Sequence, residues 1–287
     1  MDKIFVPPIK IQGIKTKLVP LIKQNIALSA EYLWVEPFMG SGVVGFNVKP
    51  RRALFADNNP HLINFYNALK SGEISSCKAK AFLTEQGKIL SERDEIYYYE
   101  VRERFNKFHA PLDFLFLNRS CFNGVIRFNR EGKFNVPYGH KPQRFSKAYV
   151  TKIVNQIRYV EECLMCFDWS FRCQDFRETL NQLDDSQSFI YCDPPYIGRH
   201  VDYYNSWSED DELALCELLK NSGKNFMVST WRQNNFRTNC CVENIWGFCR
   251  SVTQEHFYHV GAKEINRNSM IEAVLMNYYS AEETDGL

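Results

Sequence analysis

The chain has 287 residues, of which 45% are hydrophobic, 15% aromatic and 24% charged, and its net charge is +1. This composition is typical of a globular protein with a substantial core, built as one large domain or as a domain with a smaller insertion. No apolar run approaches the roughly 18 residues of a membrane helix. No basic segment followed by an apolar one opens the chain, so neither a membrane span nor a secretory signal is expected.

The ten cysteines are scattered along the chain. Cys163 and Cys166 have the spacing of zinc ligands, but no second pair of cysteines or histidines completes a set of four. We therefore expect no metal site, and we interpret the cysteines as reduced thiols of a cytoplasmic protein.

The first 72 residues alternate predicted strands and helices. Residues 32–38 read as a buried strand, a glycine-rich segment MGSGVVGFNV follows, and residues 53–59 read as a second strand. A helix is predicted over 60–72, since Pro60 suits its first turn and Gly72 its end. A strand, a glycine loop, a helix and a second strand that ends in an acid are typical of a nucleotide-binding α/β unit.

Residues 73–150 interrupt this alternation and form a predicted insertion. They combine helical stretches with a hairpin signal, in which VIRFN and KFNVP flank the three-residue loop REG. Between residues 102 and 147 there are ten Lys or Arg and three acids. A locally basic segment on a near-neutral chain favours a polyanion-binding surface, although a solvated charged face explains these charges equally well.

The alternation resumes after a helical run at about residues 146–163. It continues with predicted strands at 168–173, 188–193 and 225–230, a helix at 208–223 capped by Ser208, and antiparallel strands near 252–258 and 270–279. The sequence therefore predicts an α/β fold. Residues 1–72 and 151–287 form an open, mostly parallel sheet with helices on both faces, and residues 73–150 are a second domain inserted into it.

Four predicted strands end in or near acids that would meet at one edge of the sheet. Ligands of open α/β sheets bind beyond the carboxyl ends of the strands, where this chain offers Glu36, Asp57, Asp175 and Asp193. The glycine loop after Glu36 would let a ligand approach the backbone, and Asp57 is placed to accept from ribose hydroxyls. No Walker lysine follows the loop, which argues against a nucleoside triphosphate.

The segment SFIYCDPPYIGR ends a buried strand with an acid, two prolines and an aromatic ring. Pro194 and Pro195 stop the strand and restrict its backbone, which would hold the Asp193 carboxylate at the edge of the sheet next to Tyr196. A hydrogen-bond acceptor beside a flat ring suits an exocyclic amino group on a stacked planar base. The alternative is a proline-rich turn with a capping aspartate.

Three segments in this order, EPFMGSG, LNRSCFNGVIRFNREGKFNVPYG and DPPY, resemble the Dam-type, alpha-group DNA adenine-N6 methyltransferases. The likeness extends from about Pro8 to Tyr279. FVPPIKIQGIKTKLVP and DPPYIGRHVDYYNSW look closer still to the methyltransferase of the EcoRV restriction–modification system. The resemblance implies a Rossmann-like methyltransferase sheet that uses S-adenosyl-L-methionine and carries an inserted, mainly helical DNA-recognition domain with a β-hairpin.

The resemblance also implies a set of cofactor-binding residues. KIQGIK matches the family's amino-terminal cofactor segment, with Ile11 where the family usually has Trp and Ile14 where it usually has Gly. Lys15 matches the lysine that helps to hold the methionine end of the cofactor. The other implied contacts come from the glycine loop, the ends of the following strands and the DPPY motif, and they are Glu36, Phe38, Gly40, Gly42, Asp57, Asp175, Phe176 and Asp193.

The resemblance assigns catalysis to the DPPY residues Asp193, Pro194, Pro195 and Tyr196. The adenine amino nitrogen is a poor nucleophile because its lone pair is delocalised into the ring. Hydrogen bonds from its two protons to the Asp193 side chain and the Pro194 carbonyl would aim the lone pair at the methyl group, for direct transfer without a covalent intermediate. The target base would first leave the duplex and stack on Tyr196. Cys192 would point to the opposite side of the strand.

The inserted segment would recognise double-stranded DNA. The resemblance implies base contacts on or near the hairpin, where Arg127 suits a guanine, and phosphate contacts by the basic residues around it. The implied set is Arg119, Phe122, Asn123, Val125, Arg127, Lys133, Pro137, Tyr138, Lys141 and Arg144. The further expectations are a GATATC-type or GATC-containing palindrome, a monomeric enzyme, and a cognate restriction endonuclease that acts on the same site without a stable complex.

Three other functions fit the sequence less well. A methyltransferase of protein glutamines would have Asn in place of Asp193 and would not need the basic insertion. A DNA-binding protein with this fold but without activity would not need Asp57, Asp193 and Tyr196 together. A nucleotide-dependent oxidoreductase is disfavoured because the glycine loop opens on EPFM.

Overall fold

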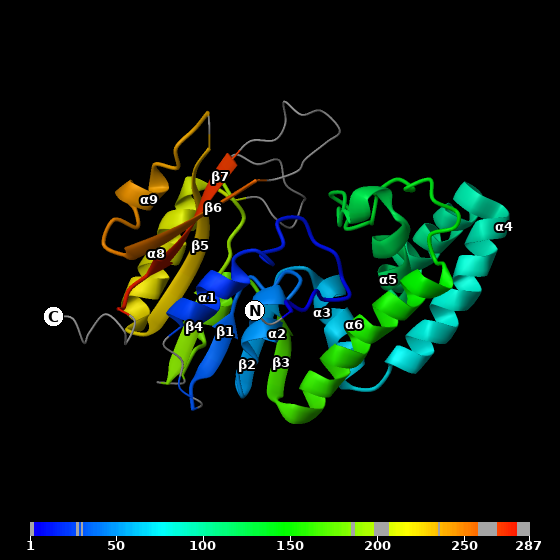
Figure 1. Ribbon diagram of the computed structural model, residues 1–287, viewed down its shortest axis with the longest axis horizontal. Coiled ribbons are helices and arrows are strands. Elements are labelled where there is room, and N and C mark those ends of the chain that lie inside the picture. The colour runs from blue at the N-terminus through cyan, green and yellow to red at the C-terminus, as the bar shows by residue number, and fades with distance from the viewer. Residues whose placement is uncertain are drawn as a thin grey trace.

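The computed structural model describes residues 3–26, 29, 31–184, 187–197, 207–234, 236–257 and 269–279. Strands in these ranges form a seven-stranded sheet in the order β3-β2-β1-β4-β5-β7-β6 (Figure 1). They are β1 (Leu33–Glu36), β2 (Arg52–Asp57), β3 (Asp168–Cys173), β4 (Ser188–Cys192), β5 (Asn225–Asn234), β6 (Arg250–Phe257) and β7 (Ser269–Met276). Every strand that the sequence predicts in the sheet is therefore present, with ends that differ by a few residues.

The sheet is open and mostly parallel, as predicted. β3, β2, β1, β4 and β5 pair in parallel in that order, and β7 pairs antiparallel to both β5 and β6. The chain order reverses at β1, because β2 and β3 lie on one side of it and β4 and β5 on the other. In open sheets such a reversal leaves a crevice beyond the carboxyl ends of the strands, which is where ligands bind.

Both faces of the sheet are covered. Alternate residues of the central strands enter two separate buried clusters: Trp34 and Tyr191 the first, Val35, Ile190 and Cys192 the second. Cys192 thus points away from Tyr191, as expected for adjacent strand residues. Helix α3 (Pro60–Lys70) contributes to the first cluster, and α7 (Phe176–Asn181) and α8 (Glu209–Ser222) contribute to the second. The other short helices of this part are α1 (Val19–Asn25), α2 (Val43–Val48) and α9 (Cys241–Asn244).

Two of these helices begin as the sequence predicts. Pro60 occupies the first turn of α3, and the Asn59 side chain accepts from two backbone N–H groups of that turn at 3.0 and 3.2 Å. Ser208 caps α8 in a capping box with Asp211, and Gly223 ends the helix at φ +65°. These caps satisfy backbone groups that the helix itself leaves without partners.

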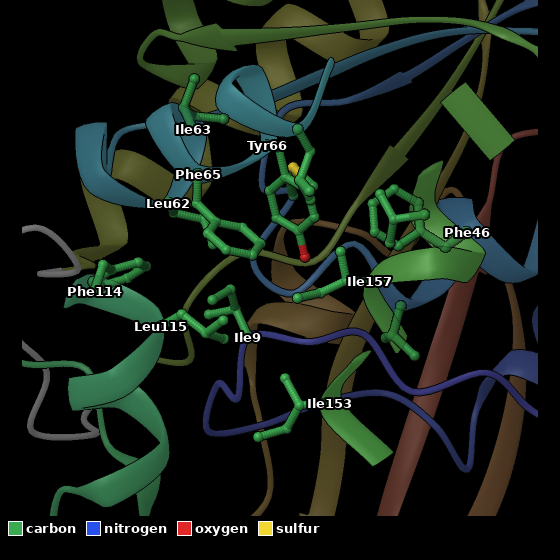
Figure 2. Packing of buried hydrophobic residues seen from close by; sticks show 14 of the residues in the cluster. Ile9, Phe46, Leu62, Ile63, Phe65, Tyr66, Phe114, Leu115, Ile153 and Ile157 are labelled. Atoms are coloured by element: carbon green, nitrogen blue, oxygen red, sulfur yellow. The ribbon is translucent and has the colours of Figure 1, made fainter. Parts of the chain in front are cut away.

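The inserted segment is helical but shares its core with the sheet domain. Its helices α4 (Ser76–Phe108), α5 (Pro111–Ser120) and the one-turn η1 (Phe122–Gly124) lie with α6 (Lys147–Cys166) beside the β3 edge of the sheet (Figure 1). Figure 2 shows that Phe114 and Leu115 of α5 belong to one buried cluster with Leu62 and Phe65 of α3. The predicted boundary between residues 150 and 151 falls inside α6. This helix packs both on α4 of the inserted segment and on α3 of the sheet domain.

The predicted hairpin is only partly formed. Phe128 pairs with Phe134 in an isolated antiparallel bridge, and Gly132 takes φ +72° in the turn between them, as its place in the loop predicts. The pairing does not extend into strands because the Asn135 carbonyl, which the next rung of the ladder would use, accepts from Nη2 of Arg127 at 3.1 Å. Asn106 on α4 holds both backbone groups of Phe134, which point away from Phe128. It accepts from the N–H at 2.8 Å and donates to the carbonyl at 3.2 Å. The hairpin is therefore a looped arm attached to α4.

None of the helices in the described ranges combines the length and the apolar character that crossing a membrane requires. In the same ranges, no group of three or more His, Cys, Asp or Glu side chains could hold a metal ion. Cys163 is buried on α6, whereas Cys166 is exposed.

Candidate active site

The carboxyl ends of β1, β2 and β4 face a cavity of about 320 Å³. Its walls come from the amino-terminal residues 11–15, the glycine loop after β1, the turn after β2, the start of α7 and the DPPY motif. All the predicted cofactor-binding and catalytic residues line this cavity except Gly42. Tertiary folding thus brings together side chains that are up to about 185 residues apart in the chain.

Glu36 supports the glycine loop from the interior of the protein. Its side chain is buried, and its Oε2 accepts from Trp34 Nε1 at 3.0 Å and from the backbone N–H of Gly45 at 3.1 Å. A Cβ at Gly45 would lie 2.7 Å from this oxygen, so a side chain there would displace the Glu36 carboxyl group. Burial raises the pKa of Glu36 to about 8, although the two hydrogen bonds oppose this rise. Gly42 lies earlier in the loop, at the N-cap of α2. Its φ of +74° is a conformation that glycine adopts readily.

Asp57 at the end of β2 ties the loop to the next turn. Its Oδ2 accepts from the N–H of Gly40, and its Oδ1 accepts from the N–H of Asn59, both at 2.9 Å. Burial raises the pKa of Asp57, and the two backbone hydrogen bonds oppose the shift. Each carboxylate oxygen can accept a second hydrogen bond, so the expected role toward ribose hydroxyls is compatible with these contacts.

An aromatic wall closes one side of the cavity. Phe176 stacks on Phe38 with ring centroids 5.3 Å apart, and Trp207 meets the edge of Phe38 at 5.4 Å. The buried Glu212 of α8 accepts from Trp207 Nε1 at 2.6 Å and from Trp246 Nε1 at 2.7 Å. The carboxylate therefore fixes the indole in the wall. Asp175, the expected neighbour of Phe176, is exposed and caps α7.

Asp193 lies where the amino-terminal segment meets the end of β4. Its Oδ1 is 2.9 Å from Lys15 Nζ and accepts from the Ser229 hydroxyl at 2.8 Å. The side chains of Lys15 and Asp193 are 5% and 22% exposed, so the pair is largely shielded from water. Burial raises the pKa of Asp193, and the charge and hydrogen bond of Lys15 oppose this rise. Lys15 thus favours the ionised form of the carboxyl.

Tyr196 is held on both its face and its edge. Lys15 Nζ lies 4.9 Å from the centre of its ring, and its hydroxyl donates to Glu272 Oε1 at 3.1 Å. Glu272 is 1% exposed on β7. The ring is therefore oriented before any ligand arrives, since a cation and a buried carboxylate both hold it.

The expected DNA-contacting residues divide into an exposed and a buried group. The exposed ones are Phe122, Asn123, Arg127, Lys133, Pro137 and Lys141, and the half-buried Val125 lines the cavity. Arg127 is steadied by Asn135, which accepts at its side chain from Nε at 2.9 Å and at its carbonyl from Nη2 at 3.1 Å. Lys133 forms a surface ion pair with Glu131. These residues make up the open side of the looped arm and of η1.

Arg119 and Tyr138, which are also expected to contact DNA, are buried in this structure, at 3% and 1% exposure. The Arg119 guanidinium donates from Nε to the Pro8 carbonyl at 2.7 Å and from Nη2 to Gln156 Oε1 at 2.7 Å. Arg144 is half-buried and donates to the Arg119 carbonyl at 2.8 Å. The guanidinium groups of Arg119 and Arg144 therefore donate to oxygens inside the protein, although the sequence predicts that they donate to DNA.

The sequence does not indicate four residues at or behind the cavity wall. Trp207 lines the cavity, and Ser229, Glu272 and Glu212 hydrogen-bond to the lining residues Asp193, Tyr196 and Trp207. Ser229 and Glu272 come from β5 and β7, which read simply as apolar strands, and a Glu inside the run MIEAVLM was the one available signal. A buried acid in a strand needs a partner, and that partner is Tyr196.

Comparison with known proteins identifies relatives over most of the chain. Residues 12–264 match the family described as D12 class N6 adenine-specific DNA methyltransferase. The DNA adenine methylase of Vibrio cholerae serotype O1 is 32% identical over 243 residues, which cover 80% of this chain and 81% of that protein. The DNA adenine methylase of Escherichia coli strain K12 is 35% identical over 224 residues, 74% of each chain. The Retron Ec67 DNA adenine methylase of Escherichia coli is 31% identical over 222 residues, 74% of this chain and 71% of that one.

Proposed function

The chain belongs to the D12 class N6 adenine-specific DNA methyltransferases, and from that premise we propose how it acts and on which site. It transfers a methyl group from S-adenosyl-L-methionine to N6 of an adenine that has flipped out of a DNA duplex. The duplex site is a short palindrome of the GATATC type or one that contains GATC. The enzyme works as a monomer in a restriction–modification system, beside an endonuclease with which it forms no stable complex. The likeness of its FVPPIK and DPPYIGR segments to the EcoRV system supports this setting.

The chemistry of the cavity suits S-adenosyl-L-methionine. Phe38, Phe176 and Trp207 offer aromatic surface for its adenine, and Asp57 offers carboxylate oxygens for its ribose. Lys15 offers a cation for the methionine end, and the volume of about 320 Å³ lies in the range of small-ligand sites. When bound, this cofactor supplies an electrophilic methyl group on a positively charged sulfonium.

Asp193 prepares the adenine amino group. Both contacts that it makes with described side chains fall on Oδ1, so Oδ2 can accept one amino proton, and the Pro194 carbonyl accepts the other. The two hydrogen bonds favour a tetrahedral nitrogen whose lone pair is free to attack. Because the carboxyl must be ionised to accept, the nearby Lys15 keeps it in the reactive form. This is catalysis by positioning and electrostatics, without a covalent enzyme intermediate.

Tyr196 and the looped arm handle the DNA. The Tyr196 ring stacks on the flipped base, which offsets part of the cost of unstacking it. Arg127 reads a guanine, and Phe122, Asn123, Val125 and the exposed Pro137, Lys133 and Lys141 contact the DNA around it. The exposure of this group and its nearness to the cavity, which Val125 lines, support the assignment.

The observation that carries the proposal is the Asp193 carboxylate held by Lys15 and Ser229 in the same cavity as the glycine loop. Its test is Asp193→Ala, assayed for transfer of labelled methyl groups to duplex DNA. Loss of an electrostatic contact to the reacting group should slow the reaction by about 10²- to 10³-fold or more. Thermal unfolding shows whether the variant is folded. A folded variant with nearly wild-type turnover would contradict the catalytic role, and Asp193→Asn gives a milder change for comparison.

The site is tested separately, on plasmid from cells that express the protein. Protection from the EcoRV endonuclease supports GATATC, and protection from an endonuclease that methylation of GATC blocks supports a GATC site. If the plasmid carries N6-methyladenine but both endonucleases still cut it, the proposed sites are wrong and the methyltransferase assignment stands.

A further inference from the structure

Residues 5–15, which we call the amino-terminal strap, join the cavity to the inserted helices. The strap is the dark blue trace that runs from the sheet towards α5 in Figure 1. At its end, Lys15 pairs with Asp193 at 2.9 Å, and Ile11 lines the cavity. Its backbone lies outside the sheet, so its polar groups need other partners.

Side chains of α5 and α6 bind alternate residues of the strap. Gln156 Nε2 donates to the Val6 carbonyl at 2.8 Å, and Arg119 Nε donates to the Pro8 carbonyl at 2.7 Å. Asn118 accepts from the Lys10 N–H at 2.8 Å and donates to the Lys10 carbonyl at 2.9 Å. Prolines at positions 7 and 8 have no N–H to satisfy. The strap thus behaves as an extended strand whose partner is a row of side chains.

The strap is also fixed to the catalytic side. Asn47 of α2 accepts from the Phe5 N–H at 2.8 Å and donates to the Phe5 carbonyl at 2.9 Å, as Asn118 does with Lys10. Ile9 is fully buried in the same cluster as Leu115 and Ile153 (Figure 2). The strap is therefore anchored at one end to α2 and in the middle to α5 and α6.

Asn118 links the strap to the exposed loop as well. Its Nδ2 is 3.4 Å from the Gly124 carbonyl of η1, and the side chain is fully buried. A Cβ on Gly124 would come within 2.8 Å of Lys10 Cδ, so strap and loop are in close contact. The same loop exposes Phe122 and Asn123. One amide side chain therefore holds both the DNA-facing loop and the segment that carries Lys15.

We propose that Asn118, supported by Arg119, is a positioning residue that couples DNA binding at the η1 loop to the cofactor cavity through the amino-terminal strap. A change at η1 shifts Lys10, and with it the placement of Ile11 and Lys15. Bound DNA and bound cofactor then raise each other's affinity, and by linkage the factor is the same in both directions. The physical basis is one contiguous segment that contacts both sites. This inference rests on the proposed function.

The test measures the coupling factor and does not depend on turnover. The dissociation constant of S-adenosylhomocysteine is determined by calorimetry with and without the duplex that the wild-type enzyme methylates fastest. We expect a factor of roughly five or more for the wild type and less than about two for Asn118→Ala. In this variant the strap should stay in place, because Arg119 Nε still donates to the Pro8 carbonyl.

Asn106→Ala is the matched control. Asn106 makes the same two bonds with the backbone of Phe134, but inside the inserted segment, so this variant should retain the wild-type coupling factor even if its affinity for DNA changes. Equal loss of coupling in both variants would indicate general loosening and overturn the inference. If Asn118→Ala does not fold, Gln156→Met, of similar volume, removes the tie to Val6 and should lower the factor, and an unchanged factor overturns the inference.

The wild-type measurements separate this inference from the proposed function. An enzyme that methylates DNA but has a coupling factor near one refutes only the role of the strap. An enzyme that methylates no adenine in any duplex refutes the proposed function, and the strap inference fails with it.

Discussion

Replacing Lys15 with Met should move the acid side of the pH–rate profile to higher pH. Lys15 Nζ and Asp193 Oδ1 are 2.9 Å apart, and the carboxylate side chain is 22% exposed. At this distance two unit charges interact by about 6 kcal/mol at an effective dielectric constant of about 20, and by about 1.4 kcal/mol at that of water. Asp193 lies between these limits because it is partly open to solvent. The interaction therefore corresponds to roughly one to four pKa units.

The direction follows from the charges around Asp193. Burial raises its pKa and Lys15 lowers it, so removal of Lys15 raises the pKa further. In the proposed mechanism the carboxyl must be ionised to accept the amino protons of adenine, so the variant should lose activity at a pH where the wild type is still active. We expect the midpoint of the acid limb to rise by at least about one pH unit.

The assay is the single-turnover rate of methylation at saturating cofactor and DNA, across about pH 5 to 9. Saturation removes any effect of Lys15 on cofactor affinity from the measured rate. Lys15→Arg, which keeps the charge, should retain a nearly wild-type midpoint, and Lys17→Met removes an exposed lysine of the same segment as a control. A Lys15→Met midpoint within about 0.3 units of the wild type would refute the reasoning, since even the dielectric constant of water predicts a larger shift.

Three further predictions concern stability, base capture and specificity. Burial raises the pKa of Glu36 to about 8, so the folded protein holds a proton there that the unfolded chain releases near its ordinary pKa. The free energy of unfolding should fall by about 1.4 kcal/mol per pH unit between these values. Glu36→Gln should remove this fall in urea unfolding at about pH 5 and 8, and an unchanged slope would count against it. Tyr196→Ala should weaken capture of a fluorescent base analogue at the target position by about 1–3 kcal/mol, far more than Tyr196→Phe or Tyr196→Trp. Equal signals from the Ala and Trp variants would contradict stacking. Arg127→Ala should relax selectivity at one base pair by about 1–3 kcal/mol, whereas Lys133→Ala slows methylation of all duplexes alike. A uniform slowing by Arg127→Ala across duplexes with single base-pair changes would show that it reads no base.

Much of the architecture could be predicted from local patterns. Pro60 and Ser208 mark helix starts because both signals are local. Pro60 lies in the first turn of α3, and the Ser208 side chain accepts from the backbone N–H of Asp211 in the first turn of α8. Strand ends could be located at Glu36, Asp57 and Asp193 because apolar runs stop there. The hairpin is shorter than the sequence predicts, since the Arg127 side chain takes the Asn135 carbonyl that a longer ladder would use. Which donor reaches that carbonyl depends on the conformation of the Arg127 side chain, which the residue pattern does not specify.

The sequence predicted which residues line the cavity, but it predicted their hydrogen-bond partners only in part. The motifs indicate that Lys15, Asp57, Asp193 and Tyr196 act together, because residue type and order are properties of the chain itself. Whether an arginine faces DNA or the interior depends on which carbonyls folding brings to it, and the partner of Arg119 is Pro8, 111 residues away. Glu272 reaches Tyr196 because β7 runs antiparallel beside β5. The sequence by itself determined the fold class and predicted the groups proposed to react, because the signals for both are local. Only the tertiary structure decided burial, pairing and the route of the amino-terminal strap, because these depend on contacts between distant segments.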